Sequence, residues 1–237
     1  MKSERAFPRL TVTPKAERSA KNGHPWVYGE EVTDVSGRYE NGDLVDVCGR
    51  SGNYLGTGFV NDRSKIRVRI ISTNANDRFD DAFFERRLRY AIAYRKTVMK
   101  EQFGCCRLLF GDSDQFPGLT IDRFDDVLGA EVLSLGMEKL KSRLFPMLVR
   151  LLREDGQNIA GLYERSDSAI RDLEGLERHN GEYPLEGCSL ASRRTARICE
   201  NGVLYDVDFV EGQKTGFFLD QKYNRAAVAR ICAGMKV

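Results

Sequence analysis

This sequence lacks several features that define particular classes of protein. No apolar run approaches the roughly 20 residues of a membrane-spanning helix, and the charged N-terminus MKSERAFPRL has no apolar segment typical of signal peptides. Only two of the 237 residues are histidine, and none of the six cysteines forms a Cys-x-x-Cys pair. The sequence therefore predicts a cytoplasmic protein with no membrane partner, no metal site and reduced thiols.

Strong net charge is also missing. The 37 basic and 35 acidic residues leave a formal net charge of +2, which by itself does not indicate a nucleic-acid-binding protein. A mild excess of Lys and Arg in residues 1–73 fits a module that binds phosphate groups, but an ordinary solvated surface is the preferred interpretation of this excess alone. A hydrophobic content of 41% and a charged content of 30% describe a globular chain of one or two ordinary domains.

Residues 7–73 read as short strands separated by turns, such as the Gly-containing turns at 41–43 and 51–53. The clearest strand is 65–71, in which apolar and cationic residues alternate. Several short strands with Gly turns predict a small β-barrel. One face of the last strand would be core and the other a cationic stripe of Lys65, Arg67 and Arg69, unless that stripe is only a solvated strand face.

A mixed α/β segment follows a polar linker at 74–80. Helical periodicity predicts helices over 81–102 and 139–153. Candidate strands lie at 107–110, 119–121, 127–135 and 159–163. Four charged residues near element ends, Arg165, Asp167, Arg171 and Glu174, are interpreted as an ion-pair cluster with a structural role.

The most informative stretch of the sequence is 211–230, which follows a predicted hairpin. Asn201-Gly202 lies between two strand-like runs, 196–200 and 203–210, and is the strongest short hairpin signal. The hairpin leads into EGQKTGFFLDQKYNRAAVAR at 211–230, whose polar groups, aromatics and two glycines suit a small polar ligand. A plain hairpin-to-helix connection is the alternative.

GQKTGFFLDQ followed by NR resembles the opening of the catalytic domain in class I methyltransferases that act on ribosomal RNA, above all the PUA-containing cytosine-5 methyltransferases of the large subunit. GHPWVY, NGDLVDV, LGTGFVN and SKIRVRI resemble the PUA domain, and FPGLTIDRFDD and YERSD resemble the central domain of that family. The resemblance implies an α+β chain: a PUA-like RNA-binding β-barrel (1–73), a mixed α/β central domain (74–195), and the opening hairpin and helix of a truncated, Rossmann-like methyltransferase domain (196–237).

The resemblance also implies a chemistry. The full-length protein would use S-adenosylmethionine (SAM) to methylate carbon 5 of a cytosine in 23S ribosomal RNA, with its nucleophilic cysteine beyond residue 237, so none of the six cysteines here is catalytic and this chain alone would be inactive. Gln213, Lys214, Thr215 and Phe217 would line the edge of the cofactor pocket, with Asp220, Gln221 and Arg225 holding the turn. Lys65, Arg67 and Arg69 would contact ribosomal RNA.

A non-catalytic RNA-binding module is the competing interpretation. It predicts salt-sensitive RNA binding without methyl transfer. The sequence does not identify the modified nucleotide, and it leaves the oligomeric state open, a homodimer included.

Overall fold

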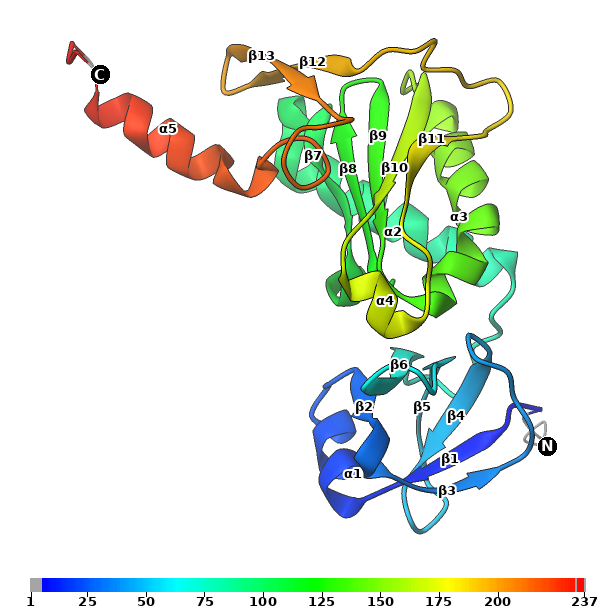
Figure 1. Ribbon diagram of the computed structural model, residues 1–237. Helices are drawn as coiled ribbons and strands as arrows, with labels where there is room; N and C mark the ends of the chain where they lie inside the picture. The colour runs from blue at the N-terminus through cyan, green and yellow to red at the C-terminus, as the bar shows by residue number, and fades with distance from the viewer. Residues whose placement is uncertain (1–5, 233, 237) are drawn as a thin grey trace.

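The computed structural model describes residues 6–232 and 234–236, which fold around two β-sheets and a separate hairpin (Figure 1). Residues 1–5, 233 and 237, at the ends of the first and last expected domains, lie outside the described residues. Within the described part, no helix combines the length and apolarity needed to cross a membrane.

The N-terminal part is a six-stranded sheet with one covering helix. Its elements are β1 (Arg9–Val12), α1 (Pro14–Lys21), β2 (Trp26–Tyr28), the 3-10 turn η1 (Gly29–Glu31), β3 (Val32–Ser36), β4 (Leu44–Cys48), β5 (Tyr54–Val60) and β6 (Ile66–Ser72). The strand order is β2-β6-β5-β4-β1-β3, and only β1 and β4 pair in parallel. The three residues of η1 join the two edge strands, β2 and β3, and span at most about 11 Å. The sheet must therefore curl so that its two edges come close together. Within the described residues, β2 and β3 do not pair with each other.

Local sequence explains this part well. The Thr13 side chain accepts a hydrogen bond from the Ala16 amide and caps α1, and Pro14 occupies the first helical turn. Positive φ angles at Gly42 and Gly52 confirm the two predicted turns. The alternation in β6 is confirmed for its apolar positions, because Val68 and Ile70 are buried in the core under α1.

The central sheet has five strands and carries two long helices. Its elements are α2 (Asp81–Met99), η2 (Lys100–Gln102), β7 (Cys105–Phe110), η3 (Gly111–Asp114), β8 (Leu119–Phe124), β9 (Val127–Val132), α3 (Leu135–Glu154), β10 (Gly161–Ser166), α4 (Ile170–Glu174) and β11 (His179–Tyr183). The order is β11-β10-β9-β8-β7, with β9 and β10 parallel and the other pairs antiparallel. The predicted mixed α/β character is confirmed.

The two faces of this sheet have different partners. Helices α2 and α3 bury their apolar sides against one face in the largest core cluster. The other face packs against the hairpin of β12 (Thr195–Glu200) and β13 (Val203–Asp208). Asn201 and Gly202 both have positive φ, as the predicted hairpin requires. The chain then passes through η4 (Leu219–Gln221) into α5 (Lys222–Ile231), which projects away from the body (Figure 1).

Three predicted boundaries of helices and strands are wrong. The helix predicted over 81–102 ends as an α-helix at Met99, because Lys100 has a φ of 50°. The second helix begins earlier than the predicted residue 139, at Leu135, and therefore cuts the strand predicted over 127–135 short at Val132.

Candidate functional site

The loop between β13 and α5, residues 208–221, is a closed turn that two glycines make possible. The Gly216 amide donates to the Gln213 carbonyl at 2.9 Å, and the Gly212 amide donates to the Asp208 carbonyl at 3.0 Å. A Cβ on Gly212 would lie 2.2 Å from the Asp208 oxygen, and Gly216 has a φ of 139°. Any larger residue at 212 would therefore force the loop open.

Three adjacent strands of the central sheet hold this 208–221 loop. Thr215 donates a hydrogen bond from Oγ1 to the Asp122 carboxylate on β8. Arg165 on β10 donates to the Gly212 carbonyl. Between them, Gly129 on β9 lets the backbone approach, since a Cβ there would lie 3.0 Å from the Thr215 oxygen. The loop is thus fixed across the face of the sheet that the hairpin also covers.

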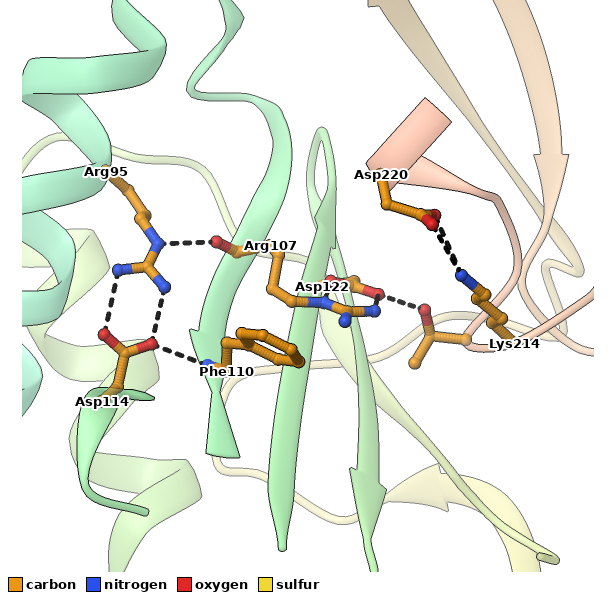
Figure 2. Close-up of polar contacts among 8 residues, drawn as sticks. Arg95, Arg107, Phe110, Asp114, Asp122, Lys214 and Asp220 are labelled. Atoms are coloured by element: carbon orange, nitrogen blue, oxygen red, sulfur yellow. Dashed lines mark hydrogen bonds and ion pairs between the residues drawn. The ribbon is translucent and has the colours of Figure 1, made fainter. Parts of the chain in front are cut away.

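Asp122 is the centre of this attachment. Its side chain is fully buried and receives two hydrogen bonds from Arg107 on β7, at 2.8 and 2.9 Å, in addition to that from Thr215 (Figure 2). The hydrogen bonding to Asp122 raises the pKa of Arg107. A buried carboxylate is stable only when it is paired in this way. Sequence reasoning missed both residues; the only available signal was that Asp122 lies within the family-like run FPGLTIDRFDD.

The exposed side of the 208–221 loop carries an ion pair between Lys214 and Asp220. Lys214 Nζ lies 2.9 and 3.0 Å from the two carboxylate oxygens of Asp220 (Figure 2), and 4.6 Å from the centroid of the Phe218 ring. The hydrogen bond from Lys214 lowers the pKa of Asp220. Gln213 is also exposed. The solvent-exposed side of the loop therefore presents one positive and one negative side chain, Lys214 and Asp220, beside the Phe218 ring.

The start of α5 is tied to the hairpin. Arg225 binds the buried Glu200 carboxylate at 2.6 and 2.8 Å, donates to the Phe218 carbonyl at 2.8 Å, and stacks 4.4 Å from the Phe217 ring centroid. Lys222 is buried and donates to the Cys105 carbonyl at 2.6 Å. Sequence reasoning missed Lys222, because a lysine in a family-like run gives no sign that it is buried.

The four residues predicted to line a cofactor pocket therefore have different environments. Gln213 and Lys214 are exposed, Phe217 is half-buried against Tyr205, and Thr215 is 2% exposed with its hydroxyl directed to Asp122. The exposed amide of Gln213 and ammonium of Lys214 are free of burial, and their role in cofactor binding stays a prediction. The Thr215 side chain instead anchors the loop.

The three residues of the predicted cationic stripe are likewise divided. Lys65 is exposed. Arg67 binds Asp62 at 2.7 Å and donates to the Tyr39 hydroxyl at 2.9 Å, and this hydrogen bond raises its pKa. Arg69 binds Glu174 of α4 at 2.8 Å. The stripe is therefore not a continuous free cationic face, and its role in RNA binding stays a prediction.

The predicted cluster of Arg165, Asp167, Arg171 and Glu174 is wrong as a mutual network. Each takes a partner elsewhere: Arg165 binds the Gly212 carbonyl, Asp167 accepts from Asn180, Arg171 binds Glu138, and Glu174 accepts from three side chains of the N-terminal part. The partners of Arg165 and Glu174 instead connect parts of the chain that are distant in sequence.

The cysteines differ in burial. Cys48, Cys105 and Cys106 are buried, and Cys199 is exposed. Burial raises the pKa of Cys105 to about 11 and that of Cys106 to about 12. Since a thiolate is the nucleophile, these two thiols are unsuited to covalent catalysis near neutral pH.

Comparison with known proteins agrees with this architecture. Residues 10–73 match the family model of a PUA-like domain. The chain is 38% identical over 218 residues to the ribosomal RNA large subunit methyltransferase I of Pseudoalteromonas translucida, an alignment that covers 91% of this chain and 52% of the relative. The protein of the same name from Klebsiella pneumoniae is 34% identical over 232 residues, 98% of this chain and 56% of the relative. The chain thus spans about half the length of the curated relatives it matches.

Two solved structures share the fold. A protein classed as a SAM-dependent methyltransferase from Streptococcus mutans superposes with a TM-score of 0.73 at 20% identity, over 93% of this chain and 53% of its own. A second protein classed as a methyltransferase, solved in complex with SAH, gives 0.72 at 21%, over 92% and 52%. At these identities the likeness is one of fold. By sequence, the chain is a relative of the ribosomal RNA large subunit methyltransferases I, with a PUA-like domain at residues 10–73.

Proposed function

We propose that this chain is the RNA-binding part, together with one edge of the cofactor pocket, of a SAM-dependent methyltransferase acting on large-subunit ribosomal RNA. One observation carries the proposal: the 208–221 loop is fixed to the buried Asp122 through Thr215, while Gln213 and Lys214 stay exposed. A loop held this firmly orients its polar groups in advance, which lowers the entropic cost of ligand binding. The sequence identity of 34–38% to proteins named for this activity supports it.

The residues of the loop have separate roles in this proposal. Lys214 offers an ammonium group, which Asp220 holds in place, to the carboxylate of the ligand, and Gln213 offers an amide. Phe217 supplies an apolar edge, while Thr215 positions the loop. When bound, SAM supplies the methyl group.

The proposed target atom is carbon 5 of a cytosine in 23S ribosomal RNA. That reaction needs a nucleophilic cysteine, and the raised pKa values of Cys105 and Cys106 argue against either of these two thiols in that role. The proposed domains are a PUA-like barrel at 1–73, a central domain at 74–195, and the opening of a Rossmann-like domain from 196. The exposed apolar residues Tyr223, Val228 and Ile231 on α5 support the last assignment, since such a domain would cover them.

A non-catalytic RNA-binding module is the second candidate, and the PUA-like match at 10–73 favours it equally. Two measurements separate the candidates: RNA binding by fluorescence anisotropy, and SAM binding by isothermal titration calorimetry. The methyltransferase proposal expects salt-dependent RNA binding together with weak SAM binding that Lys214→Ala and Gln213→Ala each reduce. RNA binding with no detectable SAM binding would favour the non-catalytic module.

A further inference from the structure

Helix α2 presents two tyrosine rings to solvent about one turn apart. Tyr90 is 67% exposed and Tyr94 is 59% exposed. Both line a cavity of ≈ 260 Å³, and residues of α2 and of the η3 turn, which include Arg87 and Ser113, form the rest of its wall. Neighbouring exposed rings with a hollow between them form a surface on which flat ligands stack.

Arg87 brings to this cavity a positive charge on which Asp77 acts electrostatically without forming an ion pair. Its guanidinium carbon lies 4.1 Å from the centroid of the Phe83 ring, and its Nη1 donates to the Gln115 carbonyl at 3.2 Å. No carboxylate within the described residues forms an ion pair with it. Burial lowers the pKa of Arg87 to about 10. An anion that accepted its remaining N–H groups would supply the missing partner.

Asp114 is the acidic residue that lines this cavity, and its negative charge does not repel an anion bound there. Asp114 accepts hydrogen bonds from Arg95 at 3.0 and 2.6 Å and from the Phe110 amide at 2.7 Å (Figure 2). Its charge is therefore neutralised within the fold.

The cavity also adjoins a second one at the boundary with the PUA-like domain. Ser113 and Gln115 line both cavities, and the second, of ≈ 350 Å³, includes His24 and Pro25 from the N-terminal part. The two cavities are therefore neighbours, and a chain bound in the first would end close to the PUA-like domain.

We propose that Arg87, Tyr90 and Tyr94 form a subsite for single-stranded RNA, with unpaired bases stacked on the tyrosine rings and a phosphate bound by the Arg87 guanidinium. The subsite rests on the proposed RNA-directed function and extends it from the PUA-like domain to the central domain. The RNA is single-stranded because stacking on a side chain requires an open base face, which a duplex hides.

Fluorescence anisotropy with a labelled, mixed-sequence 12-nucleotide RNA and the 237-residue chain tests this subsite. The double variant Tyr90→Ala/Tyr94→Ala is expected to weaken binding by about tenfold or more, and the double variant with Phe at both positions is expected to retain affinity. Arg87→Gln is expected to reduce the slope of log affinity against log salt by about one, whereas Arg87→Lys keeps the slope. Tyr223→Ala on α5, where the ring is 69% exposed, is the matched control.

The outcomes separate this subsite from the function on which it rests. Wild-type RNA binding that the alanine double variant leaves unchanged, with an unchanged circular dichroism spectrum, overturns the subsite and leaves the proposed function intact. A wild-type chain that binds no RNA even at low salt overturns both. A double variant that alters self-association by gel filtration, but not RNA affinity, shows a protein-contact surface and also overturns the subsite.

Discussion

Arg69 Nη2 lies 2.8 Å from Glu174 Oε1, and this pair joins the N-terminal sheet to the central domain. Asn61 and Ser64 from the loop between β5 and β6 also donate to the Glu174 carboxylate, at 3.0 and 2.5 Å, and the Glu174 side chain is 3% exposed. Trp26 adds a second link through its hydrogen bond to Asp112 at 3.1 Å. The contact between the PUA-like domain and the rest of the chain therefore includes a buried carboxylate that accepts from three side chains.

Removing that carboxylate should be costly. Glu174→Ala leaves Arg69 without its partner in a largely buried place, so we expect a loss of about 3–5 kcal/mol in the free energy of unfolding, measured by urea denaturation. Asp206→Ala breaks an ion pair whose two side chains are more than half exposed and should change the free energy of unfolding far less, because solvent screens the pair. Equal losses in the two variants would contradict the role assigned to Glu174.

The same carboxylate should make stability depend on pH. Burial opposes its ionisation, but the hydrogen bonds from Ser64, Arg69 and Asn61 outweigh burial and lower the pKa of Glu174 below 4.5. The folded state therefore binds this proton less readily than the unfolded state, and the contribution of Glu174 is present at neutral pH and lost as the pH falls through the folded pKa. The difference in unfolding free energy between wild type and Glu174→Gln should shrink below about pH 4.5. A difference that stays constant from pH 7 to 3 would exclude this linkage.

Thr215→Val tests the anchor of the 208–221 loop. Valine keeps the shape but removes a hydrogen bond to a buried charged group, so we expect a loss of about 1.5–3 kcal/mol in the free energy of unfolding. Thr97→Val removes an exposed hydroxyl bonded to the Ala93 carbonyl and should change stability by no more than about 0.5 kcal/mol. Should Thr215→Val unfold like wild type, the anchor is not energetically significant.

Gly212→Ala should disturb the loop through a steric clash. The new methyl group would lie 2.2 Å from the Asp208 carbonyl oxygen, a backbone atom that cannot rotate away. Gly29→Ala, where no atom lies within 4 Å, is the control. We expect proteolysis within residues 208–221 to become faster only in the first variant, as measured by limited trypsin digestion and mass spectrometry. Identical digestion of the two variants would argue against a closed loop.

The thiols should react in an order set by burial. Cys199 is exposed, whereas burial raises the pKa of Cys105 to about 11 and of Cys106 to about 12. With Ellman's reagent at pH 8 we expect Cys199 to react early and the two buried thiols only on unfolding. Labelling followed by peptide mapping identifies each site, and early modification of Cys106 would refute the assignment.

Sequence periodicity and turn chemistry by themselves determined much of the local structure. The alternation in β6, the Asn201-Gly202 hairpin and the glycines at 212 and 216 are each set by backbone angles or by burial within a few residues. The mixed α/β class follows from the same local signals. The strand β11, whose sequence HNGEY has no alternating apolar residues, was not predicted, because it exists only through its pairing with β10.

Tertiary structure alone decided which polar side chains are free and which are committed. Arg69 meets Glu174 across 105 residues, and Thr215 meets Asp122 across 93. Both were predicted to face a ligand, and both have a buried carboxylate as partner instead. A local pattern shows which way a side chain points from its own strand or turn, but the partner it finds depends on how distant elements pack, because a buried carboxylate must be paired by whatever donors the fold brings to it.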